Sequence, residues 1–262
     1  MALRDEMRNN GDVLFKYRSY LPIIILLVGL IVFIQSKLNY EQAEWNEYDN
    51  IGCVIVSIIG LLVRMITIGY SSNNTSGRNT SVGQIAESIN TTGIYALCRH
   101  PLYLGNFLMW LGIAMFTMNF WFIMAFILLF YLYYERIMYA EESFLLETFG
   151  SYYLDYSQHI PAFIPDFSHW LPPANKFSWI KVIRQEKAGI LNLSIVVFLF
   201  KSIEGYILFG IWYKLNSYWF WLLIFSLVWY LIIKLIQKNT TLLAFDRWVM
   251  VFGRHYYRSQ ET

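Results

Sequence analysis

The sequence is poor in cysteine and in charged residues, and both shortages narrow the class of protein. Only two cysteines occur in 262 residues, Cys53 and Cys98, which are too few for a disulfide framework or a cysteine-based metal site. The four histidines lack the spacing of metal ligands, so we expect no metal. Charged residues make up 15% of the chain and nearly cancel to a net charge of +2, which gives no reason to expect a nucleic acid partner.

In place of charge, the chain has apolar residues, which make up 57% of it and occur in long runs. A bilayer core of ~30 Å takes roughly 20 mainly apolar residues per helix, so these runs predict an all-α, polytopic membrane helical bundle. About six transmembrane helices are expected, at residues 20–36, 51–70, 102–117, 120–139, 188–212 and 218–236. The third and fourth are joined through Met118 and Asn119 and are predicted to form a tight helical hairpin.

The distribution of lysine and arginine predicts the orientation of the bundle. Nearly all of those outside the spans fall on the side that carries both termini and Arg99, whereas Lys37 and Lys214 fall on the other side. Because cytoplasmic loops collect positive charge, both termini and the Arg99 region are predicted to face the cytoplasm. A bacterial inner membrane and the endoplasmic reticulum both fit this multi-pass arrangement.

Residues 140–157, which follow the fourth span, have a helical pattern of a different kind. Apolar side chains such as Leu145, Phe149 and Tyr153 recur at three- and four-residue steps, and polar side chains occupy the other face. This pattern predicts an amphipathic helix along the cytoplasmic interface, bent or broken at Gly150.

The sequence Arg99-His100-Pro101 lies where the third span begins, because proline is favoured in the first turn of a helix. Free backbone N–H groups next to an arginine form a site for anions. The simpler interpretation makes Arg99 and His100 interfacial anchors and Gly105 a helix-packing residue.

A carboxylate pair, Glu141 and Glu142, follows the fourth span. Because the third and fourth spans form a hairpin, this pair is expected to return to the same membrane face as Arg99 and His100. Two glutamates at the start of an interfacial helix are also favoured by the helix dipole alone, which is the simpler interpretation.

These motifs together resemble those of the isoprenylcysteine carboxyl methyltransferase and phospholipid methyltransferase group. The resemblance covers about 75 residues, from the Gly-x-Tyr and Arg-His-Pro-x-Tyr-x-Gly motifs that begin at Gly93 to Glu-Glu-x-x-Leu, Phe-Gly-x-x-Tyr and a closing Pro165. In one position the chain differs, since family members often carry an arginine where this sequence has Ile137, and the nearest arginine is Arg136. Arg136 lies about 100° away on a helix, so its role at the acceptor is doubtful.

The resemblance implies that S-adenosylmethionine binds at the cytoplasmic face and that a lipid or lipidated acceptor enters from the bilayer. It implies catalytic roles for Arg99, facing the acceptor, and for Glu142. The residues that it assigns to the cofactor are Tyr95, His100, Pro101, Tyr103, Gly105, Glu141, Glu142 and Tyr153.

The sequence therefore predicts an integral-membrane methyltransferase, with an oxygen of a lipid carboxylate or phosphate as the preferred acceptor. The alternatives are a membrane reductase of sterols or lipids that uses NADPH, and a nonenzymatic scaffold or transporter component built around Lys201 and Glu204. We divide the chain into residues 1–92 with two spans and a polar cytoplasmic loop, residues 93–166 as the cofactor-binding core, and residues 167–262 as a two-helix extension and tail.

Overall fold

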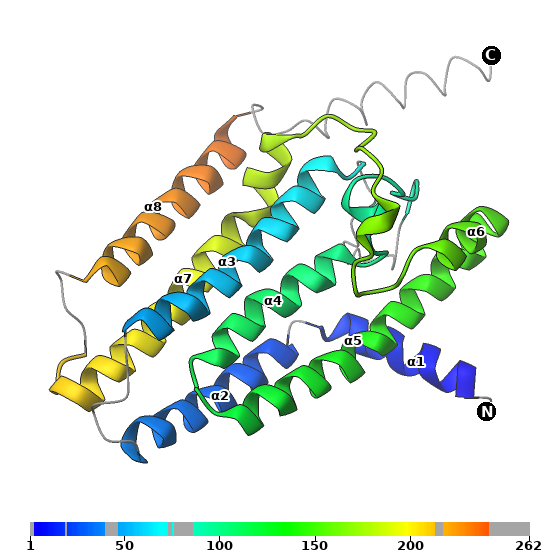
Figure 1. Cartoon of the computed structure of the whole chain (residues 1–262). Helices are drawn as coiled ribbons and strands as arrows, with labels where there is room; N and C mark the ends of the chain where they lie inside the picture. The colour runs from blue at the N-terminus through cyan, green and yellow to red at the C-terminus, as the bar shows by residue number, and fades with distance from the viewer. Residues whose placement is uncertain are drawn as a thin grey trace.

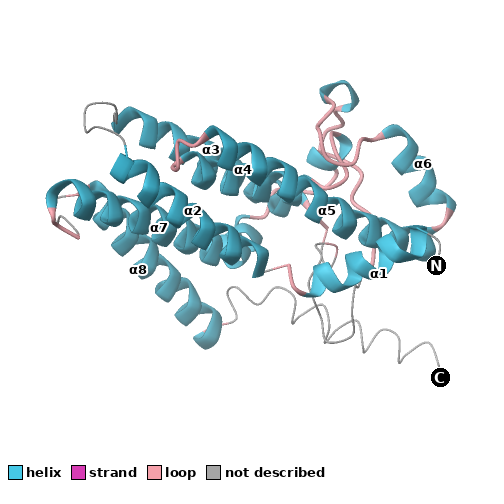
Figure 2. Cartoon of the chain, turned by 90° about the horizontal axis from the view of Figure 1, so that it is seen from below, coloured by secondary structure: helices cyan, strands magenta, loops and turns pink. Residues whose placement is uncertain are grey.

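The structure is a computed structural model that describes residues 3–18, 20–39, 47–72, 75, 86–212 and 217–240. Its secondary structure in these ranges is helical, without a β-strand, and this confirms the predicted all-α bundle (Figures 1 and 2). The α-helices are α1 (Leu3–Lys16), α2 (Tyr20–Asn39), α3 (Glu47–Tyr70), α4 (Pro101–Met115), α5 (Phe120–Phe149), α6 (Ser151–His159), α7 (Trp179–Phe209) and α8 (Tyr218–Asn239).

Five of these helices, α2, α3, α5, α7 and α8, are long and apolar enough to cross a membrane. The predicted third span corresponds to α4, which is apolar but has only 15 residues. A helix of that length rises about 22 Å, which is less than the thickness of a bilayer core. The chain is thus a polytopic helical membrane protein in which one helix of the bundle is short.

The predicted hairpin between α4 and α5 is confirmed. Met118 adopts a positive φ of 47° in the connection, and the side chain of Asn119 then caps α5 by accepting a hydrogen bond from the amide of Phe122 at 2.9 Å. Asparagine is favoured at helix N-caps because its side-chain oxygen satisfies one of the free amides of the first turn. The hairpin returns the end of α5 to the membrane face where α4 begins (Figure 1).

The predicted change from a span to a separate amphipathic helix near residue 140 is wrong. Helix α5 continues for 30 residues, because nothing between Phe120 and Phe149 breaks it. The break falls at Gly150, which has a φ of 56° and begins the short helix α6. Glu141 and Glu142 therefore lie within a long rigid helix.

The fifth span also begins earlier than predicted, at Trp179 instead of residue 188. Ser178 caps it, since its hydroxyl accepts a hydrogen bond from the amide of Lys181 at 3.3 Å. The additional turns are polar, so hydropathy alone did not detect them. They carry Glu186, which is buried, into the bundle.

The helices α3 and α4 pack closely because glycines lie in their contact. A Cβ atom on Gly60 would lie 2.5 Å from the carbonyl oxygen of Gly105, and one on Gly112 would lie 2.2 Å from the hydroxyl of Ser57. Small residues allow the backbones of membrane helices to approach in this way. The contact fixes the position of α4, and with it the Arg99-His100 turn.

The polar N-terminal segment forms α1, which packs along the end of α5 that carries the glutamate pair (Figure 1). Gly11 faces the backbone of Arg136, and the Arg8 guanidinium forms an ion pair with Glu147 in which Nη2 lies 2.7 Å from Oε2. This helix was not predicted from the sequence, because its polar composition resembles that of a solvated arm.

Candidate functional site

The turn before α4 is held by a segment that follows α6. The amides of Arg99 and His100 donate hydrogen bonds to the carbonyl oxygens of Pro161 and Ala162 at 2.9 and 3.0 Å. His100 is the N-cap of α4, and Pro101 takes its first position, as the sequence predicted. Two segments far apart in the chain thus form one rigid wall.

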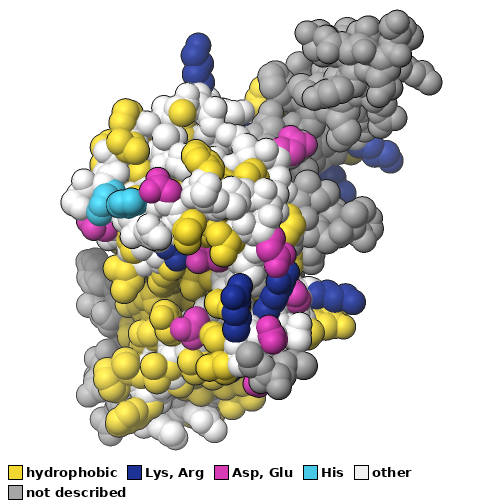
Figure 3. Space-filling view, turned by 90° about the vertical axis from the view of Figure 1, so that its right-hand side faces the viewer, with side chains coloured by type: hydrophobic (Ala, Val, Ile, Leu, Met, Phe, Trp, Pro, Cys, Tyr) yellow, Lys and Arg dark blue, Asp and Glu magenta, His cyan; other side chains and the backbone are white. Residues whose placement is uncertain are grey.

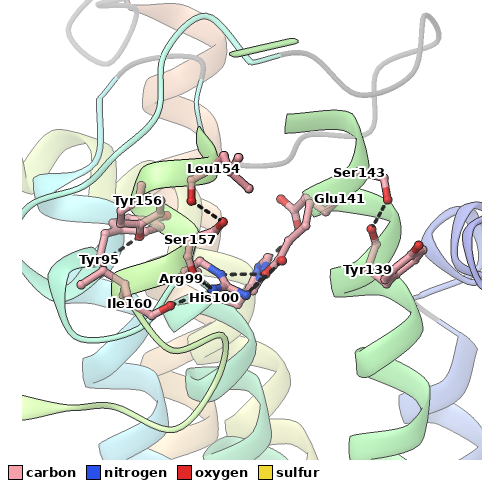
Figure 4. Close-up of polar contacts among 11 residues, drawn as sticks. Tyr95, Arg99, His100, Tyr139, Glu141, Ser143, Leu154, Tyr156, Ser157 and Ile160 are labelled. Carbon is pink, nitrogen blue, oxygen red and sulfur yellow. Dashed lines mark hydrogen bonds and ion pairs between the residues drawn. The ribbon is translucent and has the colours of Figure 1, made fainter. Parts of the chain in front are cut away.

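The guanidinium of Arg99 is surrounded by protein acceptors. Its Nε and Nη2 donate to the two carboxylate oxygens of Glu142 at 2.8 and 3.0 Å, and its Nη1 donates to the carbonyls of Ser157 and Ile160 at 2.5 and 2.7 Å. Figure 4 shows Arg99 and His100 between Ser157 and Ile160 on one side and α5 on the other. Four of the five N–H donors of this guanidinium are therefore engaged.

His100 and Tyr103 connect the turn to the same glutamates. The Nε2 of His100 lies 2.9 Å from the Oε1 of Glu142, and the hydroxyl of Tyr103 donates to the Oε2 of Glu141 at 2.9 Å. The two rings stack, with centroids 5.5 Å apart. The hairpin thus brings together the charged clusters that the sequence predicted would converge.

Three tyrosines and a cysteine complete this end of the site. The hydroxyl of Tyr156 donates to the carbonyl of Tyr95 at 2.7 Å, whereas the hydroxyl of Tyr153 is buried without a hydrogen-bond partner in the described part of the chain. Burial raises the pKa of all three phenols well above the usual value. Burial also raises the pKa of Cys98 to about 12. All four groups are therefore uncharged at neutral pH.

A cavity of about 570 Å³ begins at these residues and extends between the helices. Its lining includes Tyr95, Glu141 and Tyr153 at one end and Trp110 and Val196 farther along the bundle. Figure 3 shows this end of the molecule, where acidic and basic side chains lie among hydrophobic ones. A cavity of this size with a few polar groups in an apolar wall is typical of small-molecule sites.

Comparison with known proteins supports the same region. The family described as phospholipid methyltransferase matches residues 50–152, which include most of α3, all of α4 and all of the glutamate-bearing helix α5. The matched part contains both the Arg99 turn and the glutamate pair. The predicted resemblance to the isoprenylcysteine carboxyl methyltransferase and phospholipid methyltransferase group is thereby confirmed.

Individual relatives of the domain differ in name. A protein-S-isoprenylcysteine O-methyltransferase of Tribolium castaneum is 34% identical over 51% of this chain and 47% of its own length. One of Saccharomyces cerevisiae is 27% identical over 60% of this chain and 65% of its own, and the cobalt-zinc-cadmium resistance protein CzcN of Cupriavidus metallidurans is 28% identical over 53% and 62%. The chain thus spans about half to two thirds of these relatives. No solved structure matches it significantly.

Most of the predicted site residues line the cavity described above. These are Tyr95, Arg99, His100, Pro101, Tyr103, Glu141 and Tyr153. Glu142 lies outside the lining, behind Arg99 and His100. Gly105 also lies outside it and faces α3, where a Cβ atom would come within 2.5 Å of Arg64 and 2.8 Å of the Gly60 carbonyl. Its position matches the helix-packing interpretation.

The arginine considered for the acceptor side, Arg136, points away from the cavity. Its side chain is exposed and does not belong to the lining, while Ile137 is fully buried in a core with Phe130 and Tyr134. Two arginines that the sequence analysis did not assign to the site line the cavity instead, Arg18 and Arg64. Arg64 lies inside a predicted span, and a charged residue in such a place is a signal that could have found it.

Lys201 and Glu204, the residues of the scaffold or transporter alternative, form an ion pair that a third residue joins. Glu204 forms ion pairs with both Lys201 and Lys37, which link α7 to α2 away from the cavity. Such a cluster is consistent with a structural role between helices.

Proposed function

We propose that the protein is an S-adenosylmethionine-dependent methyltransferase that modifies a polar oxygen of a lipid or lipidated acceptor at the cytoplasmic membrane face. The observation that carries the proposal is the cavity, whose polar end is lined by the family's motif residues and whose other end is apolar and lies among membrane helices. Such a cavity accommodates a soluble donor and a hydrophobic acceptor side by side. Relatives named as O-methyltransferases support the reaction class.

The groups at the polar end fit this cofactor. The hydroxyl of Tyr153 is buried and unpartnered within the described residues and lines the cavity, so a ligand with hydroxyl, amino or ring nitrogen groups would satisfy it. Glu141 lines the same end and suits the amino or ribose groups of the cofactor. The rings of Tyr95 and Tyr156 provide flat surfaces for an adenine.

The chemistry asks the protein mainly to hold two groups in line and to exclude water. When bound, S-adenosylmethionine supplies a methyl group activated by a sulfonium. An anionic acceptor oxygen needs no general base. His100 and Tyr103 hold Glu141 and Glu142 in fixed positions, so the polar wall is preorganised before any ligand enters.

Arg99 is best described as a positioning residue in this proposal. Its two hydrogen bonds to Glu142 and its two to backbone carbonyls join α5, α6 and the turn before α4. The positive charge of Arg99 is already neutralised by the Glu142 carboxylate. The expected direct contact between Arg99 and the acceptor is therefore not needed for the proposed function.

A binding measurement tests the proposal directly. We expect S-adenosylhomocysteine to bind the detergent-purified full-length protein in a calorimetric titration, and a reduced nicotinamide nucleotide not to bind. Glu141→Gln should weaken the binding by about tenfold, which corresponds to one charge-assisted hydrogen bond.

The matched control is Glu147→Gln, which removes a carboxylate from the same helix but at an exposed position outside the cavity. It should leave the affinity unchanged. Binding of the nicotinamide nucleotide alone to folded protein would favour the reductase and contradict the proposal.

A further inference from the structure

Helix α7, which lies outside the matched domain, contributes polar side chains to the inner part of the cavity. Four polar side chains from three helices line this part of the cavity and are named the polar band: Arg64 of α3, Asn106 of α4, and Gln185 and Asn192 of α7. The first three lie five or six residues from the end of their helix nearest Arg99. That places them roughly 8–9 Å into the bundle. Asn192 lies two turns, about 10 Å, farther along α7 than Gln185.

The guanidinium of Arg64, in the polar band, is held in place by Glu186 and Asn106. The Nε and Nη2 of Arg64 donate to the carboxylate of Glu186 at 3.2 and 2.5 Å, and Nη1 donates to the side-chain oxygen of Asn106 at 2.6 Å. Glu186 is 1% exposed and does not line the cavity, whereas Arg64 does. Three of the five N–H donors of Arg64 are thus engaged by the protein. The other two remain for a ligand in the cavity that Arg64 lines.

The amides of α7 point to a ligand for a different reason. Neither Gln185 nor Asn192 makes a side-chain hydrogen bond to any described residue, and Asn192 is exposed although it lies in a helix that is long enough to span a membrane. Polar side chains at such depth almost always face the bundle interior or a cavity. Both residues line this one.

Beyond the polar band the wall becomes apolar, with Trp110 and Ile113 of α4 opposite Val196 of α7. The charged groups that line the whole cavity within the described chain are three arginines, Arg18, Arg64 and Arg99, and one carboxylate, Glu141, apart from His100. Arg64 and Arg99 are each paired with a carboxylate outside the lining, Glu186 and Glu142, so the wall presents guanidinium and amide N–H donors at its polar band. A wall with such donors that is apolar beyond them suits a molecule with an oxygen head group and a hydrocarbon chain.

We infer that α7 completes the acceptor subsite, in which the polar band holds the anionic oxygen head group of an amphiphile and the chain lies against the apolar wall. The inference rests on the proposed function and adds to it the residues that hold the acceptor head group. An oxygen held there attacks the methyl carbon of the donor. The carbon–oxygen bond forms as the carbon–sulfur bond breaks, the electron pair leaves on sulfur, and no proton has to be removed.

Three probes distinguish the sources of such a head group. The full-length protein is tested for methyl transfer from labelled S-adenosylmethionine to N-acetyl-S-farnesylcysteine, a carboxylate, to dioleoyl phosphatidic acid, a phosphate, and to dioleoyl phosphatidylethanolamine, an amine. Transfer to the carboxylate or the phosphate probe is expected. Transfer to the amine probe alone, or to none of the three by protein that binds S-adenosylhomocysteine, would overturn the inference.

Variants of the polar band test the subsite itself. Asn192→Leu should raise the KM for the accepted probe by about tenfold while the affinity for S-adenosylhomocysteine stays unchanged. Ile195→Leu is the matched control on the same helix, at a position that is 44% exposed and outside the lining. The double variant Arg64→Gln with Glu186→Gln removes the cation without leaving a buried carboxylate unpaired, and it should raise the same KM.

The two proposals fail in different ways. If the wild-type protein binds no S-adenosylhomocysteine, the proposed function fails. If it binds the product and methylates a probe, but both band variants keep the wild-type KM, the acceptor subsite lies elsewhere and only the inference about α7 fails.

Discussion

At the scale of single residues, the site separates groups that are held by the protein from groups that await a ligand. Arg99, His100 and Tyr103 all bond to the glutamate pair on α5. Tyr153, by contrast, has a buried hydroxyl with no partner in the described chain and is 3% exposed. A buried polar group without a partner is costly, so its presence in a cavity wall points to binding.

Tyr153→Phe should therefore reduce ligand affinity without harming the fold. We expect S-adenosylhomocysteine to bind about five- to tenfold more weakly, the loss of one hydrogen bond, while the thermal midpoint in detergent stays the same or rises. Tyr152→Phe is the control, since that side chain is adjacent and 59% exposed. A lower midpoint with unchanged affinity would make the Tyr153 hydroxyl structural.

At the scale of secondary-structure elements, the contact between α3 and α4 determines where the site residues lie. Gly60 and Gly105 bring the two backbones together, and Arg64, which lies one turn after Gly60, reaches Asn106 across the same contact. The contact that packs α3 against α4 therefore also places the polar side chains of the cavity wall.

Gly60→Ala should separate these helices. The new Cβ would lie 2.5 Å from the backbone oxygen of Gly105 and 2.5 Å from the amide nitrogen of Met109, and neither backbone atom can move alone. We expect a loss of about 1–3 kcal/mol in stability, seen as a lower thermal midpoint in detergent.

The control for this change is Gly52→Ala in the same helix, where a Cβ meets nothing within 4 Å. Alanine is the better helix former, so this variant should be as stable as the wild type or slightly more stable. Equal midpoints for both variants would show that the α3–α4 contact tolerates separation.

Local signals explain which elements the sequence predicted. Pro101 at the start of α4 and Asn119 at the start of α5 act through their own turns, so the hairpin and the convergence of His100 with Glu142 followed from the sequence. The contribution of α7 did not, because Glu186 and Asn192 carry no periodic pattern and meet the cavity only through tertiary packing. Gly105 was assigned to the cofactor by the family resemblance, and sequence spacing alone does not tell which face of α4 meets α3.

At the scale of the whole molecule, the loops next to α6 lie at the end of the bundle that also carries α1 (Figure 2). The cavity begins at this end, beside Tyr95, Glu141 and Tyr153. The turn at Met118 ends the α4–α5 hairpin away from Arg99. The sequence rule for positive charge places the Arg99 end in the cytoplasm, where a soluble nucleoside donor is available. This orientation is a prediction that labelling can test.

Single cysteines at the two ends should react from opposite sides of the membrane. Both test sites are exposed, Tyr152 at 59% and Met118 at 40%, so a difference in labelling reports the side of the membrane. In inside-out vesicles a membrane-impermeant maleimide should label Tyr152→Cys but not Met118→Cys. The native thiols should not react with the maleimide, because Cys53 and Cys98 are both buried. Burial also raises the pKa of Cys98 to about 12, so this thiol stays protonated at the neutral pH of labelling. The reverse pattern would place the cavity outside the cytoplasm.

The hydrogen bonds between the turn before α4 and the segment after α6 also impose an order on biosynthesis. Leu97, Arg99 and His100 find their partners at Asp166, Pro161 and Ala162, which the ribosome adds only after the whole α4–α5 hairpin. The side-chain acceptors of Arg99, which are the Glu142 carboxylate and the carbonyls of Ser157 and Ile160, are likewise added after α4. The site therefore closes only after both helices of the hairpin have been synthesised, and a chain truncated before residue 161 lacks the backbone acceptors that hold the Arg99 turn.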